Sequence, residues 1–340
     1  MNKTKLYLRA DGNSNIGLGH LMRCKALADI LRDNFECIFI VNNPDNAISQ
    51  MVEICYSLIS ISFNNLKEEL LYLQKILCKK DILVADGYQF DHFYQTKVRS
   101  MVNKFVMVDD KAEHYFDCDV IFNHGDISVL PKYNKTDSTI LYAGLDYLIL
   151  RNEFLKASKE SREIKSLESA FICMGGADPF DATIKVANAV AQCGFIKKLT
   201  VVTGSAYEKS EALERILKDF NFPTIHAKNL TAKKLVSILK KSDLAITTSS
   251  TIALEVCCVK SVLLTGIVVD NQMAIHSILT KTGSCYSIDN LRTVEIEGII
   301  NTLYNLNNSE IIQSVIKNQS LNFDGKSAER IVSIFKDLAA

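Results

Sequence analysis

The sequence predicts a two-domain α/β protein whose two parallel β-sheets face each other across a cleft. Its 340 residues exceed one ordinary hydrophobic core and suit two domains of roughly 150 residues each. Short β-branched and apolar runs alternate with longer helical patterns, which is typical of parallel sheets covered by helices. Each half also opens with a strand, a glycine-containing loop and a helix. These observations predict two Rossmann-like domains.

Changes in composition along the chain indicate where the domains begin and end. We expect a first domain over residues 1–152 and a second over residues 169–325. The intervening residues 153–168 are polar, largely charged and helical in pattern, and we interpret them as a linker. Residues 326–340 carry a further helical pattern, which could pack back on the first domain.

Apolar runs in each domain are candidate strands of the two sheets. In the first domain they span residues 6–10, 37–41, 82–85, 105–108 and 120–122. In the second domain they span residues 170–174, 199–203, 224–227, 244–247, 261–265 and 285–288. The carboxyl edge of a doubly wound sheet is where ligands bind. We therefore expect the functional residues in the loops that follow these strands.

Charge and hydropathy argue against several classes of protein. Thirty-nine Lys and Arg residues balance 39 Asp and Glu residues, so no net field attracts nucleic acid or an anionic membrane. No apolar stretch approaches the ~20 residues of a membrane-spanning helix, and no signal-like region opens the chain. We expect a cytoplasmic protein without a nucleic-acid partner or stable membrane insertion. The oligomeric state is left open.

The ten cysteines are interpreted as reduced thiols rather than as disulfides or metal ligands. None of them forms a C-x-x-C pair, and most lie inside apolar segments, as small hydrophobic residues do in a reducing compartment. The cysteines that we expect to be buried are Cys37, Cys55, Cys173, Cys257, Cys258 and Cys285.

The loop after the first strand is the most informative segment. It carries the polar residues Asp11 and Asn13, and Gly17 and Gly19 allow a close approach of a ligand. His20 would stand at the start of the next helix, where free N–H groups and the helix dipole favour anions and a neutral imidazole. His20 is therefore a candidate general base. The alternative is a histidine that only caps the helix.

That helix should bury one face, because Leu21, Cys24, Leu27 and Leu31 recur at helical spacing. The loop before it lacks both the G-x-G-x-x-G dinucleotide fingerprint and a Walker lysine, which makes a dehydrogenase or a P-loop enzyme a weak interpretation.

Several loops of the second domain are candidate phosphate and sugar sites. Gly175 and Gly176 follow a strand, so their backbone N–H groups could cradle a phosphate. Another strand leads into a run of hydroxyl residues that could donate to a diphosphate, with Glu255 one turn further on to accept from ribose. The alternative for that run is simple N-capping of a helix. The hydroxyl residues are Ser249, Ser250 and Thr251, and further candidates after the next strand are Asn271 and Gln272.

Motifs in a fixed order give the chain a resemblance to a known family. They are Arg9-Ala-Asp-Gly-Asn-Ser14, Ile16-Gly-Leu-Gly-His-Leu-Met-Arg-Cys24, Leu83-Val-Ala-Asp-Gly-Tyr88, Asp109-Asp110, Leu150-Arg-Asn-Glu-Phe154, Met174-Gly-Gly-Ala-Asp178 and Ser249-Ser-Thr-Ile-Ala-Leu-Glu255. On these motifs the sequence resembles the UDP-2,4-diacetamido-2,4,6-trideoxy-β-L-altropyranose hydrolases of pseudaminic acid biosynthesis.

The resemblance implies a GT-B-like fold, similar to that of the peptidoglycan N-acetylglucosaminyl transferase, in which water replaces the sugar acceptor. It implies that His20 positions water, that the segment with Asn229 and Leu230 meets uracil, and that Glu255 meets ribose. It also places Ser249–Thr251 on the diphosphate. Tyr88 matches a tyrosine that follows Asp-His in relatives, whereas this chain has Gly87 in place of the histidine.

The expected reaction is release of UDP with inversion at the anomeric carbon, without metal or cofactor. Asp109 and Asp110 are adjacent and would point to different sides, so we interpret them as a loop cap. Two other functions stay open. A GT-B glycosyltransferase would use the same UDP site with a hydroxyl acceptor, and a non-catalytic nucleotide-sugar-binding protein would bind UDP without releasing it from any donor.

Overall fold

The computed structural model describes residues 3–12 and 18–340, which divide into two compact units. Unit 1 is formed by Met1–Asn152 together with Lys326–Ala340, and unit 2 by Glu153–Gly325. In the described part of the chain, no helix combines the length and the apolarity that crossing a lipid bilayer requires.

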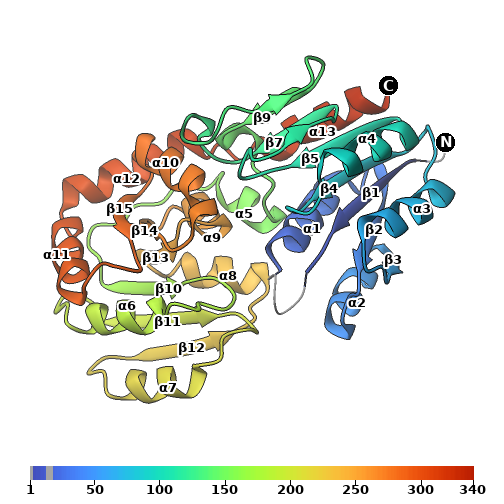
Figure 1. Ribbon diagram of the computed structural model, residues 1–340. Helices are drawn as coiled ribbons and strands as arrows, with labels where there is room; N and C mark the ends of the chain where they lie inside the picture. The colour runs from blue at the N-terminus through green and yellow to red at the C-terminus, as the bar shows by residue number, and fades with distance from the viewer. Residues whose placement is uncertain (1–2, 13–17) are drawn as a thin grey trace. The chain divides into compact units, whose positions relative to one another are not determined.

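Unit 1 is a parallel sheet with helices on both faces (Figure 1). Its strands are β1 (Thr4–Ala10), β2 (Phe35–Asn42), β3 (Ser57–Ile61), β4 (Ile82–Asp86), β5 (Lys104–Val108), β6 (Tyr115–Phe116), β7 (Val120–Asn123), β8 (Asn134–Lys135) and β9 (Ile140–Ala143). Its helices are α1 (Gly19–Leu31), α2 (Asn46–Glu53), α3 (Leu66–Ile76), α4 (His92–Met101) and α13 (Ser327–Ala339), with 3₁₀ turns at Ile127–Val129 and Leu145–Tyr147. The main sheet has the order β3-β2-β1-β4-β5-β7-β9, and β6 pairs with β8 separately.

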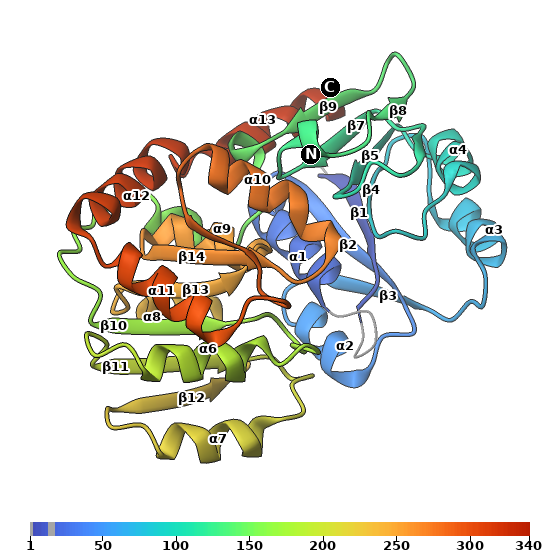
Figure 2. The same ribbon diagram turned by 60° about the vertical axis from the view of Figure 1, so that its left-hand side comes forward.

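The central strands of unit 1 are continuous apolar runs because helices cover both faces of the sheet. All five residues of β4 are buried, as expected for a strand covered on both sides. Helices α1 and α13 pack together on one face, and α3 and α4 pack together on the other (Figure 2). The predicted face of α1 is confirmed, since Leu21, Cys24, Leu27 and Leu31 are all buried. The Phe335 ring of α13 stacks on Phe122, with centroids 6.1 Å apart.

Unit 2 repeats this plan with a six-stranded parallel sheet of order β12-β11-β10-β13-β14-β15. Its strands are β10 (Ser169–Cys173), β11 (Lys198–Thr203), β12 (Thr224–Lys228), β13 (Leu244–Thr248), β14 (Val262–Ile267) and β15 (Tyr286–Asn290). Its helices are α6 (Ala182–Ala191), α7 (Ser210–Lys218), α8 (Ala232–Leu239), α9 (Thr251–Val259), α10 (Met273–Lys281), α11 (Ile296–Leu306) and α12 (Ser309–Asn322), with a 3₁₀ turn at Asp270–Gln272. Helix α5 (Asn152–Ala157) lies at the boundary of the two units.

In both sheets the strand order reverses at one point. The chain leaves β1 towards β2 and β3 on one side and then continues on the other side with β4 and β5. In unit 2 the same reversal falls between β10 and β13. The loops at the carboxyl ends of these strand pairs diverge, which opens a crevice where doubly wound proteins bind ligands.

The predicted strands are confirmed, and no end differs by more than two residues. Three details were wrong. Strands β3 and β9 of the main sheet and the two-residue strands β6 and β8 were not predicted. The segment 153–168 is helical only as far as Ala157, and Leu167 beyond it is buried in the core of unit 2. Cys55 is exposed because it follows the end of α2 in a turn, whereas the other cysteines expected to be buried are buried.

Candidate functional site

The candidate site of unit 1 begins with a histidine–aspartate pair at the point where the strand order reverses. His20 is the second residue of α1, which follows β1, and Asp86 is the last residue of β4. Because β1 and β4 are neighbouring strands, the two side chains meet although 66 positions separate them. His20 Nδ1 lies 2.6 Å from Asp86 Oδ1.

A buried arginine links Asp86 to a second carboxylate. Arg23 lies one turn after His20 and donates to Asp86 from Nε and Nη2, both at 2.7 Å. Its Nη1 and Nη2 also donate to the two oxygens of Asp110, at 2.8 and 3.0 Å. Burial opposes ionisation of Asp86, but the positive charge of Arg23 and the hydrogen bonds from Arg23 and His20 outweigh it and hold the pKa of Asp86 at about 2. Asp86 is therefore ionised at neutral pH.

The charge of Asp86 fixes the tautomer of neutral His20. An ionised carboxylate only accepts hydrogen bonds, so the hydrogen of the imidazole must be on Nδ1. The lone pair is then on Nε2, and no described residue hydrogen-bonds that atom. The 3.5 Å separation of Arg23 Nη2 from His20 Nδ1 is a contact between two donors. The pair therefore leaves His20 Nε2 as a proton acceptor, with Asp86 behind it.

Tyr88 and Lys111 lie on one side of the His20 ring. The Tyr88 ring meets His20 edge to face, with centroids 4.8 Å apart, and Lys111 Nζ lies 4.3 Å from the centre of the Tyr88 ring. Position 87 leaves little room for a side chain. A Cβ added to Gly87 would lie 2.5 Å from Oε1 of Gln89, so a histidine there would require the Gln89 side chain to move.

Asp11 is engaged by hydrogen bonds and an ion pair within unit 1. Its carboxylate accepts hydrogen bonds from the Asn42 N–H and from Gln89 Nε2, each at 2.9 Å, and pairs with Arg9. Arg9 is itself buried and also pairs with Glu69 at 2.7 Å. Gly19 is exposed at the first position of α1. The predicted residues Asn13 and Gly17 lie outside the described residues.

The side chains of Asp109 and Asp110, after β5, point to different sides as predicted, but only Asp109 caps the loop. Asp109 accepts from the N–H groups of Lys111 and Ala112, at 3.0 and 2.7 Å, and so caps the loop. Asp110 turns to Arg23 instead, which sequence reasoning missed. Among the residues that the structure describes, no group of three or more His, Cys, Asp or Glu side chains could hold a metal ion.

The Asp-x-Asp sequence Asp117-Cys-Asp119 is also used inside the fold. Asp117 pairs with Arg99 and accepts from Thr96, and Asp119 accepts from the Phe105 N–H at 2.9 Å.

The glycine loop of unit 2 follows β10. Gly175 has φ +94°, a conformation that favours glycine, and Gly176 is exposed. A Cβ added to Gly204, in the loop after β11, would lie 2.5 Å from the carbonyl oxygen of Gly176. The two loops therefore touch through their backbones, and Lys209 pairs with Asp181 across them. Only glycine fits at position 204 without displacing the glycine loop.

The hydroxyl run lies where β13 leads into α9. Because β13 is the neighbour of β10 in the sheet, the run and the glycine loop follow adjacent strands. Ser250 is the N-cap residue, yet its side chain accepts no hydrogen bond from the first turn of α9 within the described structure. The N-capping alternative therefore does not explain this serine. The Ala253 N–H donates to the Ser250 carbonyl at 2.9 Å, whereas the N–H groups of Thr251 and Ile252 before it remain available to an anion in the described structure. Ser249 is fully buried, and its Oγ lies 2.8 Å from His276 Nδ1 and 3.1 Å from Thr265 Oγ1.

The remaining predicted residues of unit 2 lie at or near the same edge of its sheet. Asn229, with φ +51°, follows β12 and donates its N–H to the Thr203 carbonyl at 3.1 Å, and Leu230 beside it is half-buried. Glu255 is 4% exposed, one turn into α9. Asn271 is half-buried, and Gln272 Oε1 accepts from the Val268 N–H at 2.8 Å.

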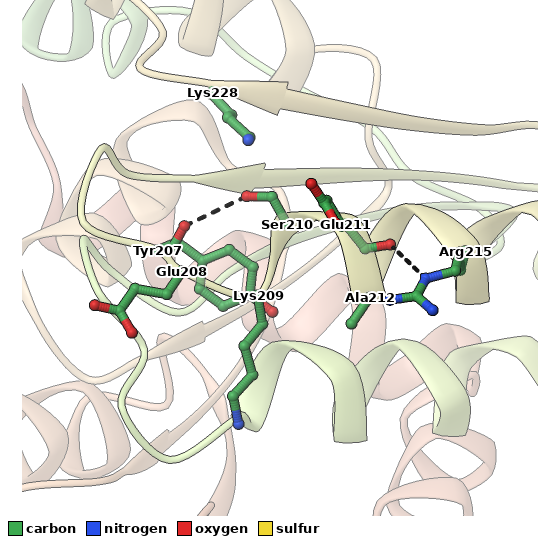
Figure 3. A pocket seen from close by; sticks show the side chains of 8 residues that line it. All are labelled: Tyr207, Glu208, Lys209, Ser210, Glu211, Ala212, Arg215 and Lys228. Carbon is green, nitrogen blue, oxygen red and sulfur yellow. Dashed lines mark hydrogen bonds between the residues drawn. The ribbon is translucent and has the colours of Figure 1, made fainter.

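A polar cavity of about 440 Å³ lies at the start of α7, close to these loops in sequence (Figure 3). Its lining carries charges of both signs, and none of the predicted substrate-binding residues takes part in it. The lining residues are Tyr207, Glu208, Lys209, Ser210, Glu211, Ala212, Arg215 and Lys228. Ser210 donates to the Tyr207 carbonyl, and Arg215 to the Glu211 carbonyl, so part of this polar surface is satisfied internally.

Comparison with curated proteins finds distant relatives. No protein-family model matches the chain. It is 26% identical over 338 residues to the spore coat polysaccharide biosynthesis protein SpsG of Bacillus subtilis, covering 97% of both chains. It is 25% identical over 288 residues to the UDP-2,4-diacetamido-2,4,6-trideoxy-β-L-altropyranose hydrolase of Campylobacter jejuni, covering 82% of this chain and 97% of that one.

A third relative is an uncharacterized protein of Methanocaldococcus jannaschii, 27% identical over 254 residues. That match covers 72% of this chain and 51% of the relative, so the chain spans about half the length of this protein.

Solved structures share the fold over the whole chain. The MurG protein of Acinetobacter baumannii matches with a TM-score of 0.65 at 11% identity, covering 98% of this chain and 99% of that one. The Phytolacca americana protein UGT2, solved with UDP-2-fluoro-glucose and pterostilbene, matches with a TM-score of 0.66 at 11% identity, covering 99% and 100%. The predicted GT-B-like fold is thus confirmed, and so is the resemblance to the altropyranose hydrolase, of which this chain is a distant relative.

Proposed function

We propose that the chain is a nucleotide-sugar hydrolase that releases UDP from UDP-2,4-diacetamido-2,4,6-trideoxy-β-L-altropyranose, in pseudaminic acid biosynthesis. The observation that carries this proposal is the 2.6 Å pair of His20 and Asp86 at the reversal point of the unit 1 sheet. Support for the substrate comes from the name of the Campylobacter jejuni relative, which is 25% identical over 288 residues. The motifs on which the sequence resembles the altropyranose hydrolases support it as well.

In the proposed reaction His20 Nε2 accepts a proton from water as the water oxygen bonds to the anomeric carbon. The bond between that carbon and the β-phosphate oxygen breaks, and UDP leaves with the electron pair. Attack from the face opposite UDP inverts the anomeric centre. Asp86 stabilises the imidazolium that forms and holds the His20 ring in place. A general base such as His20 increases the reaction rate by about 10²–10⁴-fold. The proton then passes to bulk water, which restores neutral His20.

Unit 2 contributes the groups that hold UDP in this proposal. The leaving diphosphate gains negative charge, and the open N-terminus of α9 with the Gly175–Gly176 loop offers backbone N–H groups to it. Thr251 and Ser250 add hydroxyl donors beside that terminus. Glu255 is assigned to ribose and Asn229 with Leu230 to uracil, and Asn271 and Gln272 to the sugar or diphosphate. No step requires a metal or a cofactor.

The proposal is tested by mixing the purified protein with the UDP-sugar and following UDP and free sugar by NMR. Release of both in equal amounts, with the inverted anomer formed first, is the expected result. An intact substrate would contradict the assignment. Adding hydroxyl acceptors or other UDP-sugars then separates the alternatives, because a glycosyltransferase forms a glycoside and a binding protein forms no product.

A further inference from the structure

A second histidine, His276 on α10, lies directly behind the hydroxyl run of unit 2. Its side chain is 12% exposed, both ring nitrogens contact serine hydroxyls, and Nε2 also lies 4.0 Å from the exposed carboxylate of Asp289. Nδ1 lies 2.8 Å from Ser249 Oγ, and Nε2 lies 3.0 Å from Ser287 Oγ on β15. The sequence motifs assign no role to His276. Its position ties the turn before α9 to two other elements of the unit.

The hydrogen atoms in this network can be assigned by counting donors. Thr265 Oγ1 donates to the Thr247 carbonyl at 2.9 Å, which uses its single hydroxyl hydrogen. The 3.1 Å contact between Thr265 and Ser249 must then use the hydrogen of Ser249. Ser249 Oγ therefore accepts from His276, and the hydrogen of the imidazole is on Nδ1. The single hydroxyl hydrogen of Ser287 serves either His276 Nε2, at 3.0 Å, or the exposed carboxylate of Asp289, at 3.2 Å, and the bond from Nδ1 to Ser249 stands in both cases.

This arrangement leaves Ser249 no free donor. Its backbone N–H donates to the Gly266 carbonyl at 2.9 Å, and its hydroxyl hydrogen points to Thr265. The residue is fully buried. Ser249 is thus fixed by its backbone and its side chain, and the next two residues, Ser250 and Thr251, open α9 from this fixed point. Its hydroxyl cannot donate to a phosphate while the network stands.

We propose that His276 is a positioning residue for the diphosphate, acting through Ser249. By donating from Nδ1 to Ser249 it holds the turn so that the N–H groups of α9 and the hydroxyls of Ser250 and Thr251 meet the two phosphates. Burial lowers the pKa of His276 although the nearby charge of Asp289 opposes this shift, and the contribution that we assign to the ring is one of geometry. The inference rests on the proposed UDP site and adds a residue to it that does not touch the nucleotide.

The two ring nitrogens can be tested separately by calorimetry of UDP binding to the full chain. In His276→Asn the amide nitrogen takes the place of Nδ1, which keeps the bond to Ser249. In His276→Gln the amide takes the place of Nε2, which keeps Ser287 and loses Ser249. We expect His276→Gln to weaken UDP binding about 5-fold, whereas His276→Asn and the control Ser287→Ala bind like the unaltered protein. KM for the UDP-sugar should rise with the dissociation constant of UDP, and kcat should change little.

The contact can also be removed from its other side. Ser249→Ala should weaken UDP binding as much as His276→Gln, and the double variant should show no further loss, because both remove one interaction. If His276→Gln does not fold by circular dichroism, Ser249→Ala alone carries the test.

Wild-type affinity in His276→Gln or Ser249→Ala would overturn the inference, as would equal losses in the Asn and Gln variants. An unaltered protein that binds UDP and releases none from the sugar would contradict the hydrolase alone. An unaltered protein that does not bind UDP would overturn both proposals.

Discussion

The two candidate sites use the same place in the fold for opposite chemistry. Each lies where the strand order of a parallel sheet reverses, after β1 and β4 in unit 1 and after β10 and β13 in unit 2. Unit 1 places ionised side chains there, with Arg23 between Asp86 and Asp110 and His20 beside them. Unit 2 places backbone N–H groups, glycines and hydroxyls there.

Under the proposed function, this difference separates proton transfer in unit 1 from anion binding in unit 2. A general base needs a nearby charge that orients it and stabilises its protonated form, which Asp86 provides. A diphosphate is already charged, and uncharged N–H donors hold it without a titrating partner. Changes in unit 1 should therefore alter turnover without altering UDP affinity, and changes in unit 2 should do the reverse.

The largest effect is expected from His20→Asn. The asparagine amide can still donate to Asp86 from the position of Nδ1, but nothing replaces Nε2, so only the base is lost. We expect kcat to fall by about 10²–10⁴-fold with unchanged UDP affinity. UDP release and calorimetry measure the two quantities. The control is His92→Asn, at an exposed position of α4. If His20→Asn keeps its turnover, the assignment of His20 as the general base is wrong.

Asp86→Asn should reduce both turnover and stability. Arg23 keeps Asp110 but loses a buried carboxylate, which costs about 3–5 kcal/mol in the free energy of unfolding. Because the pKa of Asp86 is about 2 in the folded protein and ~3.9 in an unfolded chain, Asp86 adds stability above the unfolded value. That contribution is lost as the pH falls from about 4 to about 2. Urea unfolding at several pH values measures it.

In Asp86→Asn this part of the pH dependence should be missing, whereas Asp137→Asn at an exposed loop position should unfold like the unaltered protein. If the two variants show the same acid profile, the ion pair of Asp86 with Arg23 does not stabilise unit 1.

Gly204→Ala tests the backbone contact in unit 2. The added Cβ would lie 2.5 Å from the Gly176 carbonyl oxygen, so the glycine loop must move. We expect a loss of about 1–3 kcal/mol in stability and weaker UDP binding, with kcat less affected. Gly194→Ala is the matched control, because its Cβ meets nothing within 4 Å and should be neutral or slightly stabilising. Thermal unfolding and calorimetry give both quantities, and equal melting temperatures in the two variants would contradict the contact.

The smallest effect is expected from Thr251→Val, which exchanges a hydroxyl for a methyl group at the start of α9. Loss of one hydrogen bond to a phosphate should weaken UDP binding by about 3- to 10-fold and leave kcat nearly constant. Thr302→Val, within α11, serves as the control. A fall in kcat with unchanged UDP affinity would break the proposed division between the units.

The sequence predicts the central strands of both sheets but not their edges. Strands covered by helices on both faces are continuous apolar runs, as in β4, and such runs are recognisable. The two missed strands of the large sheet, β3 and β9, are its edge strands, and their residues are largely exposed or half-buried. Because an edge strand is only partly covered, it does not require a continuous apolar run, and the sequence pattern that identified the central strands is missing.

For the candidate site, single residues could be proposed but their partners could not. His20 was found from its loop and helix, whereas Asp86 entered only as part of the motif Leu83–Tyr88, directly after the predicted strand 82–85. Their contact depends on β1 lying beside β4, and strand order is not written in local composition. The same holds for Ser249 and His276, which are 27 positions apart and meet through the packing of α10 on β14.

The return of α13 to unit 1 has a consequence for the order in which the molecule is made. Phe335, whose ring packs on Phe122 and Phe35, is synthesised only after all of unit 2. At about 5–20 residues per second, the ribosome needs roughly ten seconds or more to reach it from the end of β9. During that interval two aromatic rings of unit 1 lack their cover. Unit 1 therefore gains the contacts of Phe335 only after unit 2 has been made.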